Sequence, residues 1–473
     1  MKRKRNSFLC FVVLLISVGA VRSQDTVQFS IDAFYRQVAE FHPMVRQARL
    51  LSEQARQEIR FARGSFDPKL EASFATKEFQ DKSYFSTFET AVTLPTRSPI
   101  QPKVGFERTT GELLDPSEKI PGNEQAFAGV SLQLGRGLLT DERRTVLRQA
   151  EQMVNMFEAE QVKLVNKILL EAASAYWNWY YRYRAETVFD RAATVSQEIL
   201  DGVKLNFSQG EASVLDTVQS SITNQARQIE KQEARLQLKN AKIALSNFLW
   251  ADGNSPIMLS ANAVPLLPVS GVIRAEEELA MLSERARENH PELIKLRTKI
   301  EILELDQRLA REFVKPRLDL NYALLSQPGA AQSIDLSNDY KLGLDFSFPL
   351  FLRKERSKLK LMGLKLNQTN LETGFLEREI LNTLQQTFNE LITMQGLLSR
   401  QFNMVKSYER LMEGELLNLR NGESDLFKIN VQQEKLLQSQ EKLAKLESDY
   451  QKRKAYLWWS AGISPLDSTA PRQ

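Results

Sequence analysis

Hydrophobic and polar residues alternate along this chain with two different periods, and both occur in the same order twice. Apolar residues stand at every second position in residues 70–76, 130–134, 318–324 and 342–350. This period predicts strands with one apolar and one polar face. The last of them turns four side chains to its apolar face: Leu342, Leu344, Phe346 and Phe348.

The other period is helical, and its stretches are unusually long. One helix is predicted from about Thr140 to Phe207 and another from about Glu211 to Trp250. A second pair consists of a helix from about Lys354 to Arg420 and a last helix after the break at Asn421-Gly422. At about 1.5 Å per residue the first is on the order of 100 Å long. Apolar residues at steps of seven predict coiled-coil seams: Leu215, Ile222, Ile229, Leu236, Ile243 and Trp250 in the first half, and Leu384, Leu391, Leu398, Val405, Met412, Leu419, Ile429, Leu436, Leu443, Tyr450 and Leu457 in the second.

Short motifs repeat along with the periods. His42-Pro43 precedes Pro68 as His290-Pro291 precedes Pro316, and the second proline stands 25 positions after the first each time. We therefore divide the chain into two structural repeats, each with strands and a long helical hairpin. The two histidines, each before a helix-starting proline, are interpreted as capping or packing residues. The predicted segments are a signal peptide at 1–23, a first repeat at 24–252 with strands about 69–135, a Pro-rich linker at 253–271, a second repeat at 272–463 with strands about 317–350, and a tail at 464–473.

Segment 80–125 has no clear counterpart in the second half. Residues 84–94 and 103–109 alternate weakly and are candidates for two further strands. The segment either adds a hairpin to the sheet or forms an external loop.

The N-terminus has the features of a secretory signal. A basic start, an apolar run from Phe8 to Val18 and small residues near Ser23 follow in order. The one cysteine, Cys10, lies inside the apolar run, which predicts an exported chain with no lipid anchor and no disulfide. Because no later stretch has the length of a spanning helix, membrane insertion would require strands.

Charge and residue chemistry exclude several functions. The chain has 63 basic and 59 acidic residues, too balanced to indicate nucleic-acid binding. With two histidines, no Gly-rich phosphate loop and no set of ligands at metal spacing, we expect no enzyme, no cofactor and no metal site. The aromatic residues within 176–181, and Trp458-Trp459, are interpreted as packing rather than as a ligand platform.

The strands are too few to stand alone in a membrane. Four or six strands cannot close a barrel, since the smallest single-chain barrels have about eight, and an open edge leaves backbone groups unpaired in lipid. The strands must therefore be completed by sister chains. A ring of the long hairpins would continue the barrel as a hollow tube, and the whole would be a conduit.

The chain resembles the outer-membrane efflux protein family, the TolC-like channels. The likeness rests on the repeated His-Pro motifs, on residues 346–351 at a strand-to-helix junction and on the turns at Gly210 and Gly422, and it covers nearly the whole predicted mature chain. It implies mainly helical protomers with membrane strands: a homotrimer with a shared outer-membrane β-barrel, four strands from each chain, and a trans-periplasmic α-barrel. It also implies an exit duct that passively conducts substrates from an inner-membrane pump through a periplasmic adaptor, with outer-membrane lipid around the barrel.

The resemblance also assigns roles to the two turns, as the periplasmic tips that contact the adaptor and narrow to a gate. Asp216 matches an acidic family position, whereas Lys428 stands at the corresponding place after Gly422 and Asp425 lies closer to the turn. The alternatives for these charges are a mixed Asp/Lys constriction or ordinary exposed helix charges. The candidate tip residues are Asn206, Phe207, Gly210, Glu211, Leu419, Arg420, Gly422 and Glu423.

A second hypothesis is a periplasmic coiled-coil scaffold that never enters the membrane. It shares the heptads with the channel hypothesis. The amphipathic strands distinguish the two hypotheses, since a scaffold that stays in water would leave the apolar face of such a strand exposed to solvent.

Overall fold

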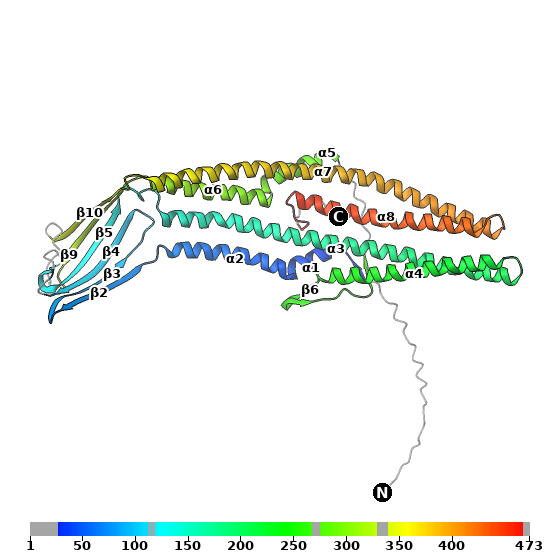
Figure 1. The fold of residues 1–473 in the computed structure, drawn as a ribbon, viewed down its shortest axis with the longest axis horizontal. Helices are drawn as coiled ribbons and strands as arrows, with labels where there is room; N and C mark the ends of the chain where they lie inside the picture. The colour runs from blue at the N-terminus through cyan, green and yellow to red at the C-terminus, as the bar shows by residue number, and fades with distance from the viewer. Residues whose placement is uncertain (1–26, 112–113, 115–118, 267–274, 329–338, 467–473) are drawn as a thin grey trace, which may run out of the picture.

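The computed structural model describes residues 27–111, 114, 119–266, 275–328 and 339–466. The predicted signal peptide, residues 267–271 of the predicted linker, residues 272–274 of the predicted second repeat and residues 467–473 of the tail lie outside this part. The described chain is strongly elongated, with one β-sheet at one end and the turns of two helical hairpins at the other (Figure 1). No helix in the described ranges combines the length and apolarity needed to cross a membrane.

The helices repeat in order, as predicted. Each half has two shorter helices, a helix of 67 or 68 residues and a returning helix. They are α1 (Ile31–Phe41), α2 (Pro43–Gly64), α3 (Glu142–Ser208) and α4 (Val214–Ser246) in the first half, and α5 (Ala275–Asn289), α6 (Pro291–Glu312), α7 (Arg353–Arg420) and α8 (Leu426–Ser460) in the second.

The two histidines are helix caps, as predicted. The Nδ1 atom of His42 accepts a hydrogen bond from the backbone N–H of Met44 at 3.2 Å, and that of His290 accepts from Glu292 at 3.3 Å. Each thereby satisfies one of the N–H groups that the first turn of a helix leaves unpaired. Burial lowers the pKa of both imidazoles, which favours the neutral ring that can accept.

Segment 80–125 joins the sheet. The six strands are β2 (Lys69–Phe79), β3 (Lys82–Thr93), β4 (Ile100–Thr110), β5 (Glu124–Gln133), β9 (Arg317–Ser326) and β10 (Tyr340–Ser347). Their spatial order is β10-β9-β5-β4-β3-β2, and every neighbouring pair is antiparallel. In the described residues the sheet thus has six strands, rather than the four that the resemblance implied.

Short strands occupy the predicted linker and its surroundings. In that region β6 (Trp250–Ala251) pairs with β7 (Ser255–Pro256), and β8 (Ala263–Pro265) pairs in parallel with β1 (Val27–Phe29). The linker is thereby tied to the N-terminus of the described chain.

Two hydrophobic clusters hold the helices together at mid-length. In the first, α3 contributes Tyr176, Trp177, Trp179 and Tyr180, all fully or almost fully buried in a cluster that includes side chains of α1 and α4. In the second, α5 and α6 pack on α7 and α8, with Trp458 among the buried side chains. Five of the aromatic residues predicted to be packing residues therefore belong to the core, whereas Tyr181 and Trp459 are partly buried outside the two clusters.

Candidate functional site: the amphipathic sheet and the helical tips

The strand register places one largely apolar face across all six strands, with the Arg108–Glu124 pair on the same face near the outer end of β4 and β5. A row of directly paired residues crosses all six strands, and each of its side chains is apolar or aromatic. Because side chains alternate between faces, the neighbouring rows at steps of two lie on the same face, and most of their members are also apolar. The central row is Tyr340, Leu324, Ala128, Val104, Val92 and Leu70.

The four residues predicted to face lipid lie on or next to this face. Leu342, Leu344 and Phe346 of β10 stand on it, and each is more than half exposed. Phe348 follows directly after the strand and is also exposed. A contiguous exposed apolar face of this extent marks a surface meant for another medium or partner.

The opposite face is largely polar. Its charged side chains alternate with small residues such as Gly105 and Gly129, where an added Cβ would meet neighbouring atoms at 2.4 Å. The charges balance, with five basic and five acidic residues: Lys69, Lys77, Lys103, Arg317 and Lys341 against Glu71, Glu89, Glu107, Asp319 and Asp345.

The strands are staggered along the sheet. In the central row Tyr340 is the first residue of β10, at the end away from the helices, whereas Leu70 is the second residue of β2, next to them. From this row β2 extends nine residues outward, to Phe79, while β10 extends seven residues inward. The strand ends are therefore offset steadily from β10 to β2. With about 3.3 Å per residue along a strand and about 4.8 Å between neighbouring strands, a line through the strand ends makes an angle of roughly 40–50° with the perpendicular to the strands. This stagger is the shear that barrel closure requires.

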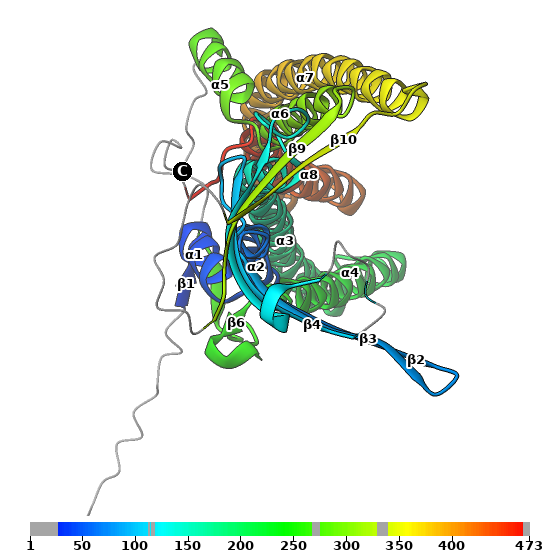
Figure 2. The ribbon, with the colours of Figure 1, turned by 90° about the vertical axis from the view of Figure 1, so that its left-hand side faces the viewer.

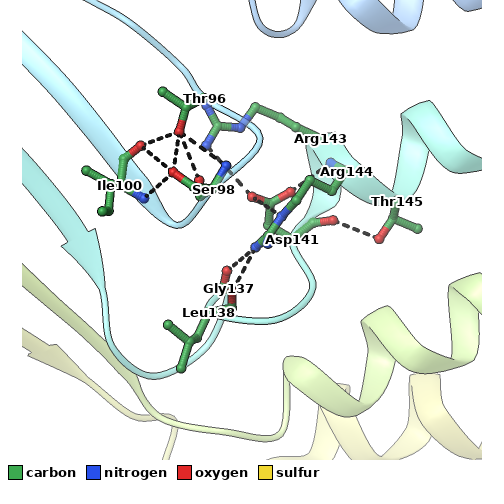
Figure 3. Close-up of polar contacts among 9 residues, drawn as sticks. All are labelled: Thr96, Ser98, Ile100, Gly137, Leu138, Asp141, Arg143, Arg144 and Thr145. Atoms are coloured by element: carbon green, nitrogen blue, oxygen red, sulfur yellow. Dashed lines mark hydrogen bonds and ion pairs between the residues drawn. The ribbon is translucent and has the colours of Figure 1, made fainter.

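Polar contacts fix the end of the sheet nearest the helices (Figure 3). Asp141 caps α3 by accepting from the backbone N–H of Arg144 at 2.7 Å, and the Arg144 guanidinium donates to the carbonyls of Gly137 and Leu138. The turn between β3 and β4 is held by bonds among the hydroxyls of Thr96 and Ser98 and the carbonyl of Ile100, drawn in the same view. Both the turn and the helix start are therefore fixed by hydrogen bonds.

The two helical tips have the same backbone geometry. Gly210 and Gly422 have φ of 83° and 77°, the left-handed region that favours glycine. In each tip the N–H after the glycine donates back to an asparagine carbonyl: Glu211 to Asn206 at 2.9 Å and Glu423 to Asn418 at 2.8 Å. This is the Schellman motif that ends a helix. The described side chains among the predicted tip residues are exposed or half-exposed, with Phe207 exposed and Leu419 half-exposed.

The candidate gate residues are parts of helix caps in a single chain. Asp216 and Ser213 form a capping box at the start of α4, and the hydroxyl and backbone N–H of Ser213 hold the Asp216 pKa below its usual value. Asp425 caps α8 by accepting from the backbone N–H of Lys428, whose Nζ lies 3.8 Å from the Asp425 carboxylate. The spacing Ser213-x-x-Asp216 is a sequence signal for the first cap, similar to the capping box.

One ion pair joins the hairpins in a way the sequence did not indicate. Arg227 of α4, 6% exposed, donates to Glu230 on its own helix and to Glu434 of α8 at 2.7 Å. The two partners lie 207 positions apart, so no local pattern predicts the contact. Nowhere in the described ranges do three His, Cys, Asp or Glu side chains gather as a metal-binding group.

The long helices form an arc with two open ends. Seen along the molecule, α7 and α4 lie at the ends of the arc, with α8 and α3 between them (Figure 2). Both outer helices carry exposed apolar side chains along their length: Leu215, Ile222, Ile229, Leu236 and Ile243 on α4, and Leu364, Leu371, Phe375, Leu397, Met404 and Leu411 on α7.

Solved structures of outer-membrane channels share the fold of this chain. No protein-family model matches the chain, and no curated protein matches it in sequence. Among solved structures, the Campylobacter jejuni CmeC outer membrane channel is similar with a TM-score of 0.65 at 12% identity, over 92% of this chain and 87% of that one. The outer membrane protein VceC from Vibrio cholerae gives 0.64 at 14%, over 92% and 96%. The open Neisseria gonorrhoeae MtrE outer membrane channel gives 0.65 at 13%, over 92% and 89%.

These similarities span nearly the full length of both partners in each comparison. At 12–14% identity they establish the fold. The TolC-like fold expected from the sequence is thereby confirmed, with long helical hairpins at one end and membrane-type strands at the other.

Proposed function

We propose that this chain, which has the fold of outer-membrane channels, is one of three identical subunits of an exit duct in a tripartite efflux or secretion system. The duct conducts substrates passively from an inner-membrane pump and a periplasmic adaptor to the outside. The observation that carries the proposal is the apolar face that stays in register across six staggered strands. Lipid is the medium that such a face fits, and the balanced polar face fits a water-filled interior.

The outer helices supply the contacts for the homotrimer. The exposed apolar rows of α4 and α7 lie at opposite ends of the arc, so the α4 row of one protomer meets the α7 row of the next. Such a heterologous contact closes into a ring when the rotation between copies is right. The same rotation joins the free edges of β2 and β10 between neighbours.

The two tips are the proposed adaptor contacts and the narrow end of the duct. Exposed apolar side chains cluster there, among them Phe207 and Leu215 at the first tip and Phe427 at the second. Three copies would bring Asp216 near the axis, and the Asp425–Lys428 pair would stand on the neighbouring tips. The duct has no energy-coupling role in this proposal, since the pump supplies the driving force.

A matched pair of lysine substitutions on β10 tests membrane insertion. Leu342→Lys places a charge on the apolar face, whereas Gly343→Lys places the same charge on the polar face, where the site has room. The first is expected to destabilise the inserted barrel by about 2–4 kcal/mol and to reduce the heat-modifiable trimer in the outer-membrane fraction. The second is expected to have little effect.

Recovery of the unmodified chain in the soluble periplasmic fraction would contradict the proposal. It would favour the coiled-coil scaffold instead. Equal effects of the two lysines would mean that the two faces of the sheet meet the same environment, which a membrane barrel does not permit.

A further inference from the structure

We infer that the hairpin of β3 and β4 is part of the membrane wall, so that three chains close a barrel of 18 strands with a correspondingly wide mouth. The inference rests on the proposed homotrimer and adds the size of its pore. Six strands per chain come directly from the sheet order, in which β3 and β4 stand between β2 and β5.

The first support is that the hairpin has the membrane pattern of its neighbours. On β3, Phe88 and Val92 stand on the apolar face, and on β4, Val104 and Phe106 do so. On the other face, Glu89 of β3 contacts Lys103 of β4 at 3.2 Å. A hairpin that formed a surface loop outside the barrel wall would be solvated on both faces. An apolar face in register with that of the other strands would then have no physical cause.

The second support is the form of the connections. At the end away from the helices, Gln80 and Asp81 have φ of 53° and 55°, a tight two-residue turn between β2 and β3. At the end near the helices, the turn between β3 and β4 spans only residues 94–99. The β3–β4 hairpin therefore spans the sheet, from the far rim to the helices and back to the rim.

The third support is the parity of the strands. With six strands alternating in direction, β2 runs away from the helices and β10 runs toward them. The β10 of one copy can therefore pair antiparallel with the β2 of the next, so the wall closes without a mismatched junction. The 11-residue outer edge of β2 needs such a partner, because an open edge in lipid leaves its backbone groups unpaired.

The number of strands determines the diameter of the proposed barrel. Barrel diameter grows roughly linearly with strand number, so 18 strands give about 1.5 times the diameter of 12. At a tilt of about 40° and a strand spacing of about 4.8 Å, the backbone ring is roughly 35 Å across. Its inner face carries balanced charge, so the barrel itself would admit bulky cargo of either sign and would contribute little charge selectivity.

The test compares the full chain with a variant lacking residues 80–119. This deletion joins Phe79 to Ile120 and leaves a four-residue turn between β2 and β5, giving four strands per chain. Ser131→Cys, on the polar face, is introduced into both the full chain and the deletion variant. Val130→Cys, on the apolar face, is introduced into both as the matched control. Maleimide-polyethylene glycols of increasing size are added to outer membranes.

We expect Ser131→Cys to be labelled by polymers with a radius roughly 1.5 times larger in the full chain than in the deletion variant, and Val130→Cys to stay unlabelled. The same size limit in both backgrounds would overturn the 18-strand wall. Equal labelling of both cysteines in the full chain would instead overturn the membrane barrel, and with it the proposed function. If the deletion variant does not assemble, a strand count by electron cryo-microscopy of the full-length trimer decides, since 18 strands support the inference and 12 refute it.

Discussion

The returning helices of the two repeats, α4 and α8, carry the same heptad pattern and are buried to opposite extents. On α8, Ile429, Leu443, Tyr450 and Leu457 are 0–7% exposed, whereas the five heptad residues of α4 from Leu215 to Ile243 are 48–78% exposed. The difference follows from position, because α8 lies between α3 and α7 while α4 packs on α3 and barely touches α8. A heptad row thus predicts that a seam is buried, and the fold decides whether the same chain or a neighbour covers it.

The largest effect is expected from charges placed on the α4 row. Ile229→Asp with Leu236→Asp should abolish the trimer while leaving the helical content of the chain intact. An unpaired carboxylate in an apolar interface costs several kcal/mol, roughly a hundredfold or more in association. Sedimentation of the detergent-solubilised protein measures this.

The control for the charged variant is Gln237→Asp, which adds a carboxylate on the flank of the same helix. This variant should remain trimeric. Loss of the trimer in the control as well would mean that charge in general, rather than the apolar row, controls assembly.

A smaller effect, on the fold rather than on assembly, is expected from the α8 row. Leu457→Ala removes a side chain that is 1% exposed in the second cluster and should cost about 2–5 kcal/mol of folding stability. The matched change on α4, Leu236→Ala, should cost about 0.5 kcal/mol or less in the dissociated chain. Urea unfolding followed by circular dichroism, on chains dissociated by Ile229→Asp alone, measures both, and equal losses would contradict the assignment of the two rows.

The smallest effect is expected at the link between the two helices. The hydrogen bond from Arg227 lowers the pKa of Glu434, so the pair stabilises the fold above the ordinary glutamate pKa of about 4.3 and this contribution is lost as pH falls through the lowered value. Because the Glu434 side chain is 46% exposed, its contribution at neutral pH is about 1 kcal/mol. Glu434→Gln should lower stability at pH 7 by about that amount and flatten its decline below pH 4. An unchanged pH profile would show that the pair is not formed in solution.

Most of the architecture was predictable because it rests on local signals. Helix lengths follow from uninterrupted periodicity, the tips from Gly210 and Gly422, and the histidine caps from the prolines that follow them. The strand faces follow from alternation, as at Leu342 and Leu344. Each of these features depends on residues close together in the sequence.

The remainder depends on contacts between distant segments. The pairing of Arg227 with Glu434 and the insertion of β3 and β4 into the sheet are both set by tertiary packing. Alternation in segment 80–125 is weakened by polar residues such as Thr90 on the apolar face and Phe85 on the other. The sequence therefore left a loop and a hairpin equally open, and only the strand register separates them.

Cross-linking tests the central claim most directly, namely that the exposed α4 row is covered by α7 of a neighbouring copy. Ile229 lies 19 residues from Gly210 and Met404 lies 18 residues from Gly422, so both stand at a similar distance from the tips. Outer membranes containing the Ile229→Cys, Met404→Cys double variant are treated with a short bis-maleimide, and each single variant serves as control. We predict covalent dimers and trimers only in the double variant, whereas a double variant that remains monomeric would show that α7 of a neighbour does not cover the α4 row.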